Sequence, residues 1–176
     1  MPLQPTHKDA GFTLFEVITV LALITVFTVL AIVRHSASDA TLVAQTQVLA
    51  SHIRYAQMRA LNTETSWGIF YNYNAANPQD CYYHLFRGSN TADIAQLPGE
   101  SQNKVIIGGM GISISSAPPA GTPSARSFRI SFDSWGRPTW DITGIGAGSE
   151  TLTLRLAKSG QTPQDIRVTQ NTGFIP

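Results

Sequence analysis

The most prominent pattern in the sequence is a long apolar run close to its N-terminus. From Phe12 to Val33 the chain is apolar apart from Glu16 and four threonines, and no charge occurs after Glu16 in this run. A helix rises about 1.5 Å per residue, so this run spans roughly 30 Å, the thickness of a bilayer core. The pattern therefore predicts a transmembrane helix at residues 12–33, with one carboxylate just inside its start.

Beyond this run the chain becomes polar but keeps a helical stripe of apolar residues. The stripe consists of Leu42, Leu49, Ile53, Ala56 and Ala60, and Val48 and Leu61 are expected to widen its buried face. Spacings of three, four and seven residues place these side chains on one side of a helix. No proline interrupts residues 12–77. One helix over about 12–62 is predicted, whose amphipathic part, 34–62, packs on a head domain.

After residue 62 the pattern changes to short strands separated by turns. Seven strands are expected, at 66–73, 81–87, 104–107, 111–115, 127–133, 151–157 and 165–169. Alternation predicts that Phe128, Ile130, Phe132, Leu152, Leu154 and Leu156 face the core, and that Arg129 and Arg155 point outward. The predicted fold class is α+β, a long N-terminal helix packed on an antiparallel, sandwich-like β head at residues 63–176.

Turn chemistry separates these strands. In the segment from Phe132 to Pro138, Asp133 can cap a turn, Gly136 can take a positive φ, and Pro138 is expected to prevent strand pairing beyond the turn. Residues 115–125 are predicted to form a mobile proline-rich loop, and the glycine-rich residues 144–149 a flexible connection.

Composition adds few chemical candidates. The chain has 176 residues, a net charge of +1 and 43% hydrophobic residues, which suits one globular domain with an appendage. Its single cysteine, Cys81, is expected to be buried and inert, with intermolecular pairing as the alternative. The four histidines lack metal-ligand spacing, and Asp133 with Asp141 is too sparse a set for calcium. No catalytic or phosphate-binding motif occurs, so no enzyme activity, cofactor or metal is expected.

Three interpretations of the N-terminus compete. A secretory signal peptide would be cut near the small residues 36–38, but the apolar run is long for a signal core and Glu16 interrupts its start. An ordinary single-span anchor would place Glu16 at the membrane interface, where the helix dipole favours an acid.

The third interpretation is a resemblance carried by Lys8-Asp9-Ala10-Gly11-Phe12-Thr13-Leu14-Phe15-Glu16-Val17-Ile18. This segment resembles the class III signal of type IV pilins and type II secretion pseudopilins. The resemblance implies a leader at residues 1–11, cleavage between Gly11 and Phe12 by prepilin peptidase, and N-methylation of Phe12. It also implies that Glu16 pairs with the N-terminal amine of a neighbouring subunit during assembly, because two buried charges that are costly alone tolerate each other as a pair.

Two further segments, 49–61 and 132–138, resemble GspH/FimT-like minor pilins and pseudopilins, and the first also resembles minor pilins of the mannose-sensitive haemagglutinin pilus. The expected partners are other pilin or pseudopilin subunits, prepilin peptidase and the assembly platform of the bacterial inner membrane. The expected location is a single-pass inner-membrane protein with a periplasmic head, followed by a filament. Arg54 and Arg59 are expected on a helix edge bonded to head-domain carbonyls, with inter-subunit pairing as the alternative.

Two other functions are also compatible with the sequence. One is a DNA-uptake minor pilin, because some relatives in this group bind DNA through a basic C-terminal segment. Here residues 168–176 carry no basic residue, and acids lie among Arg126, Arg129 and Arg137, so nucleic acid is not favoured. The other is a plain membrane-anchored periplasmic β-domain. The sequence does not choose between a secretion pseudopilus and a type IV pilus.

Overall fold

The computed structural model describes residues 13–117, 124–173 and 175, and describes only the backbone of 29–39. The chain divides into two compact units, Met1–Ser38 and Asp39–Pro176. The leader 1–11 and residue 12 therefore lie outside the described residues.

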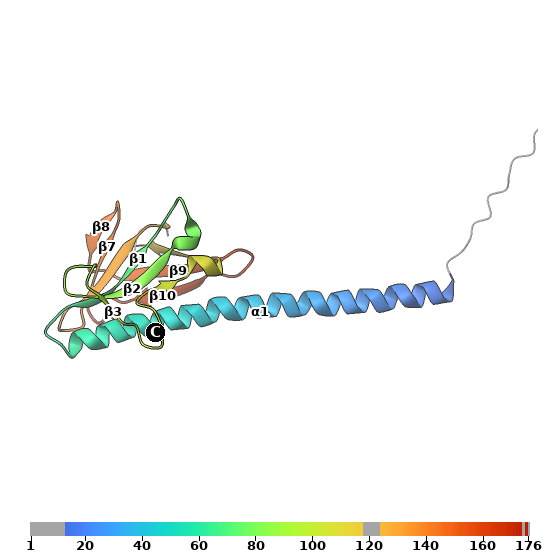
Figure 1. Cartoon of the computed structure of the whole chain (residues 1–176), viewed down its shortest axis with the longest axis horizontal. Coiled ribbons are helices and arrows are strands. Elements are labelled where there is room, and N and C mark those ends of the chain that lie inside the picture. Colours follow the sequence, from blue (N-terminus) through green and yellow to red (C-terminus); the bar gives the residue numbers. More distant parts are fainter. Residues whose placement is uncertain (1–12, 118–123, 174, 176) are drawn as a thin grey trace, which may run out of the picture. The chain divides into compact units, whose positions relative to one another are not determined.

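One helix and ten strands form the described part of the chain (Figure 1). The helix α1 covers Leu14–Leu61, close to the predicted 12–62. Within the second unit its apolar stripe is buried as predicted, since Leu42, Leu49, Ile53, Ala56 and Ala60 are each at most 1% exposed. The prediction for Leu61 was wrong: its side chain is 53% exposed, because the last turn of α1 carries it away from the core face.

The larger sheet has seven strands, all paired antiparallel, in the order β3-β2-β1-β6-β7-β8, with β4 also paired to β2. Its strands are β1 (Trp67–Asn72), β2 (Tyr82–Arg87), β3 (Ile94–Ala95), β4 (Val105–Ile106), β6 (Phe128–Phe132), β7 (Pro138–Ile142) and β8 (Gly146–Gly148). Short 3-10 turns, η1 (Pro78–Asp80) and η2 (Gly108–Met110), flank β2 and β5.

A smaller antiparallel sheet completes the head. It has the order β10-β9-β5, with β5 at Ile112–Ala117, β9 at Leu152–Lys158 and β10 at Gln164–Val168. The apolar stripe of α1 and the inward faces of both sheets share one buried cluster. The residues predicted to face the core on β6 and β9 all belong to it: Phe128, Ile130, Phe132, Leu152, Leu154 and Leu156. The predicted α+β class with an antiparallel head is confirmed.

The strands β3, β7 and β8 were not predicted. The expectation that Pro138 prevents strand pairing beyond the turn was also wrong. Pro138 begins β7 and lies opposite Phe132 in the ladder, because a proline is tolerated at the first position of a strand. The predicted flexible connection at 144–149 contains β8, where Gly148 lies so close to the Trp140 ring that a Cβ would meet its atoms at 2.5–2.9 Å. Glycine here permits a close approach rather than flexibility.

The predicted loop at 115–125 begins later than expected. Residues 115–117 belong to β5, and residues 118–123 lie outside the described part of the chain. The other turn predictions are confirmed. Asp133 Oδ1 accepts hydrogen bonds from the backbone N–H groups of Trp135 and Arg137 at 2.9 and 2.8 Å, and Gly136 has a φ of 73°.

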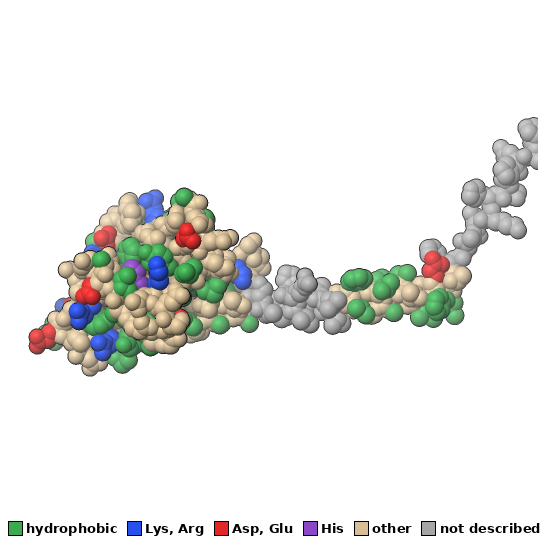
Figure 2. Space-filling view, viewed as in Figure 1, with side chains coloured by type: hydrophobic (Ala, Val, Ile, Leu, Met, Phe, Trp, Pro, Cys, Tyr) green, Lys and Arg blue, Asp and Glu red, His purple; other side chains and the backbone are tan. Residues whose placement is uncertain are grey.

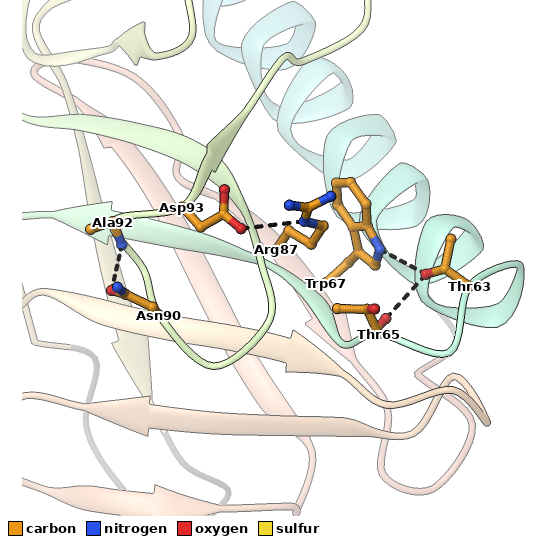
Figure 3. A network of polar contacts seen from close by, with 7 residues as sticks. All are labelled: Thr63, Thr65, Trp67, Arg87, Asn90, Ala92 and Asp93. Carbon is orange, nitrogen blue, oxygen red and sulfur yellow. Dashed lines mark hydrogen bonds and ion pairs between the residues drawn. The ribbon is translucent and has the colours of Figure 1, made fainter.

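The junction between α1 and β1 is held by Trp67. Its indole N–H donates to the Thr63 hydroxyl at 2.8 Å. The Thr63 hydroxyl in turn has two carbonyl acceptors within reach, that of Arg59 at 2.8 Å and that of Thr65 at 3.2 Å (Figure 3). The Arg59 guanidinium carbon lies 4.6 Å from the centre of the Trp67 ring, a cation–π contact. These contacts fix the last turn of α1 on the first strand of the head.

Candidate assembly site at the start of the first helix

The start of α1 is fixed by a hydrogen bond between Thr13 and Glu16. Thr13 directly precedes the first helical residue, Leu14, and its Oγ1 accepts a hydrogen bond from the Glu16 backbone N–H at 3.3 Å. The Thr13 carbonyl also accepts from the N–H groups of Glu16 and Val17 at 3.1 and 3.2 Å. Thr13 is therefore the N-cap, and Glu16 is the third helical residue, which is the spacing of a capping box.

The Glu16 carboxylate lies in the first turn of α1, where the positive end of the helix dipole favours an acid. The ion pairs Arg87–Asp93, Arg129–Asp141 and Arg155–Asp165 all lie in the head, and Glu16 takes part in none of them. The predicted amine partner belongs to residue 12, which lies outside the described residues, as does Gly11. The site therefore consists, in the described part, of an exposed carboxylate held at a capped helix start.

The residues that follow Glu16 present an apolar surface. Large hydrophobic side chains from Leu14 to Phe27 are 45–80% exposed, and Figure 2 shows them in green with a single acidic side chain at the beginning of the segment. The threonines are satisfied within the helix: Thr19, Thr25 and Thr28 donate to backbone carbonyls three or four residues earlier at 2.7–3.0 Å. Glu16 is thus the one charged group of residues 13–28.

The capping role of Thr13 was not predicted. Glu16 was predicted from the motif, whereas Thr13 was counted among the threonines of the apolar run. The spacing Thr-x-x-Glu before an apolar segment would have revealed the cap, because that spacing lets the side chain of the first residue accept the N–H of the fourth.

Within the head, Arg54 and Gln57 bind the C-terminal segment to α1. Arg54 donates from Nε and Nη2 to the Ile175 carbonyl at 3.2 and 3.0 Å. Gln57 Nε2 donates to the carbonyls of Gly136 and Thr172 at 3.0 and 2.7 Å. The predicted bonding of Arg54 to a head-domain carbonyl is confirmed, whereas Arg59 stacks on Trp67 instead.

His52, His84 and Cys81 are buried in the head, and each contacts neighbouring polar groups there. His52 lies between the Tyr83 hydroxyl and the Pro98 carbonyl, at 3.0 and 3.2 Å, and His84 Nε2 lies 2.8 Å from the Thr91 carbonyl. Burial lowers the pKa of both imidazoles. Cys81 is buried, as predicted. Its Sγ accepts the Asn74 backbone N–H at 3.3 Å.

The remaining charged candidates lie on the head surface. Arg126 donates to the Thr143 carbonyl at 3.2 Å, and Arg129 Nη2 lies 3.6 Å from Asp141 Oδ2. Arg137 follows the β6–β7 turn and is exposed. Among the described residues, no group of three or more histidine, cysteine or acidic side chains could hold a metal ion.

Comparison with known proteins gives a match at the N-terminus. Residues 6–32 match the family described as the prokaryotic N-terminal methylation motif. No curated protein and no solved structure matches the chain. Where side chains are described, at residues 13–28, 40–117, 124–173 and 175, no helix is both long and apolar enough to cross a membrane. The predicted span 12–33 extends beyond these residues. The chain carries, over residues 6–32, the N-terminal methylation motif of type IV pilin-like proteins.

Proposed function

We propose that this chain is a minor pilin or pseudopilin, a structural subunit of a type IV pilus or a type II secretion pseudopilus. It acts by assembly rather than as an enzyme. It is made as an inner-membrane precursor with a single span and a periplasmic head. Prepilin peptidase removes residues 1–11 and methylates the new N-terminal Phe12, and the mature subunit then joins a filament through its apolar helix.

The observation that carries this proposal is the methylation motif combined with the isolated charge of Glu16. Cleavage before Phe12 creates an amine four residues before Glu16 in the sequence. A carboxylate among exposed apolar side chains is costly in hydrocarbon, on the order of a few kcal/mol, and the amine of a neighbouring subunit offsets this cost. The contact thus selects processed subunits, because an uncut leader leaves the Phe12 nitrogen in a peptide bond.

The first test is the N-terminus of the chain in membranes. Mass spectrometry of the protein from cells with prepilin peptidase is expected to find a chain that starts at N-methylated Phe12. Cells that lack the peptidase are expected to keep the full chain from Met1. An intact Met1 start in peptidase-containing cells contradicts the proposal.

The second test separates assembly from folding. Glu16→Ala is expected to lower the amount of processed subunit in sheared or purified filaments by about tenfold or more, since one partner of a desolvated charge pair is lost. Thr19→Ala is the matched control, because the Thr19 hydroxyl bonds only to its own helix in the described structure. Equal incorporation of Glu16→Ala and wild type would contradict a role of Glu16 in assembly.

A further inference from the structure

The outer face of the larger sheet carries a row of four side chains on adjacent strands. His84 of β2 lies opposite Phe70 of β1, Phe70 lies opposite Arg129 of β6, and Arg129 lies opposite Asp141 of β7. Their neighbours along the strands, among them Ile69 and Ile130, are buried in the core. Because side chains alternate between the two faces of a strand, the row lies on the face directed away from α1.

A pocket of about 190 Å³ lies on this row. It is lined by Phe70, Thr91, Phe128, Arg129, Asp141 and Thr143. An ion pair, two threonines and two phenylalanines thus meet around a space that suits a single small ring better than an extended chain. None of these residues belongs to the helix start described above, so the pocket is independent of the assembly site.

Neighbouring residues fix the positions of the groups that line the pocket. Since a carbonyl only accepts, His84 Nε2 must donate to the Thr91 carbonyl at 2.8 Å. The His84 ring lies 5.3 Å from the Phe70 ring, centre to centre, and fixes that aromatic wall. Arg129 Nη1 donates to the Ser89 carbonyl at 3.4 Å. The ligand-facing groups are therefore positioned before anything binds, which lowers the entropy cost of binding.

The charges of the pocket select the class of ligand. Arg129 and Asp141 are 3.6 Å apart and both are about a third to a half exposed, so each neutralises the other and each keeps hydrogen-bonding capacity towards solvent. An anion in the pocket would be repelled by the Asp141 carboxylate, and a cation would be repelled by the Arg129 guanidinium. A neutral molecule with several hydroxyl groups can donate to the carboxylate and accept from the guanidinium without such repulsion.

We propose that this pocket binds a single neutral sugar residue, such as one hexose of a glycan. The carboxylate of Asp141 accepts hydrogen bonds from sugar hydroxyls, and the guanidinium of Arg129 donates to a sugar oxygen. The C–H face of the sugar ring packs on Phe70, since aromatic rings bury apolar surface at low conformational cost. Thr91 and Thr143 line the same space.

The test uses the full chain in micelles of a detergent without a sugar head group, because maltoside or glucoside heads would compete. Saturation-transfer NMR with a panel of neutral hexoses and disaccharides is expected to find at least one that receives magnetisation from the protein. Inorganic phosphate and a zwitterionic amino acid serve as competitors. Neither is expected to displace the sugar, and displacement by either one contradicts the proposed class of ligand.

The variants locate the site. Asp141→Ala is expected to weaken binding of that sugar by about tenfold, the loss expected for a hydrogen bond to a charged group. Phe70→Leu is expected to weaken binding as well, because the flat aromatic surface on which the sugar ring packs is lost. Asp165→Ala is the matched control: it removes the Arg155–Asp165 ion pair, which joins directly opposite residues of β9 and β10 at 2.8 Å in the other sheet. The proposal is overturned if no sugar of the panel binds, or if Asp165→Ala weakens binding as much as Asp141→Ala.

Discussion

His52 Nδ1 lies 3.0 Å from the hydroxyl of Tyr83, and this contact joins α1 to β2 inside the head. Since the Pro98 carbonyl can only accept, His52 Nε2 carries the proton directed at it at 3.2 Å. The neutral imidazole then accepts from the Tyr83 hydroxyl through Nδ1. In the neutral form, both ring nitrogens of His52 therefore have a hydrogen-bond partner. Protonation would place a positive charge in a buried site.

The first prediction concerns the effect of acid on stability. Burial lowers the pKa of His52, although the Pro98 carbonyl and the Glu100 carboxylate oppose this shift. In the unfolded chain the imidazole takes up a proton near pH 6.5. In the folded state His52 takes up this proton only at lower pH. The free energy of unfolding is therefore highest above about pH 6.5 and decreases as the pH falls below that value. For one such histidine, the free energy of unfolding changes by at most about 1.4 kcal/mol per pH unit.

Urea unfolding of the full chain between pH 7.5 and 5.5 measures this slope. His52→Gln is expected to flatten it, because glutamine does not titrate. His84 also has a pKa lowered by burial, so the double variant with His84→Gln is expected to flatten the slope further. An unchanged slope in the double variant would show that neither histidine links protonation to folding.

The second prediction concerns the C-terminal segment. Arg54→Lys removes the paired donation to the Ile175 carbonyl, and we expect local opening of this segment to become easier by about 1 kcal/mol. The Gly173 N–H, which donates to the Thr169 carbonyl at 3.0 Å, reports this opening in native-state hydrogen exchange. Arg167→Lys on the exposed side of β10 is the control, and equal acceleration in both variants would contradict the prediction.

Much of the head could be predicted because its burial follows simple periods. The stripe from Leu42 to Ala60 and the alternation on β6 and β9 each repeat often enough to reveal the buried face. The missed strands lack such repetition. β3 has two residues, β8 is Gly-Ala-Gly, and β7 begins with a proline. Their places are determined by pairing with neighbours already in the sheet, which a local pattern does not contain.

The two candidate sites differ in the same way. Glu16 stands in a contiguous motif with Thr13, so a reading of adjacent residues finds it. The pocket on the outer face depends on the register that sets Phe70 opposite Arg129 and Arg129 opposite Asp141. These residues come from distant parts of the chain, and alternation alone predicts only that Arg129 points outward. Sequence reasoning could therefore supply the motif but not the pocket.

The third prediction concerns the helix start. Thr13→Val removes the hydroxyl that accepts the Glu16 N–H, and loss of an N-cap costs about 0.5–2 kcal/mol of local helix stability. We expect increased fraying of residues 14–17, seen as faster amide exchange of Glu16 and Val17 in micelles. Thr19→Val is the control, since its hydroxyl bonds back to Phe15 within the helix. Identical exchange in Thr13→Val and wild type would show that this bond does not hold the helix start.

The last prediction concerns Gly68 on β1. A Cβ at this position would collide with the Ile130 carbonyl oxygen and lie 2.7 Å from the ring of Phe86, and the carbonyl belongs to the paired strand β6. Gly68→Ala must therefore push two strands apart, and overpacking of this kind costs about 1–3 kcal/mol. Gly109→Ala is the matched control, because the nearest atom to its added Cβ would lie 3.9 Å away. Urea unfolding of the full chain is expected to show a lower midpoint for Gly68→Ala and little change for Gly109→Ala, whereas equal midpoints would mean that β1 and β6 have room for a methyl group.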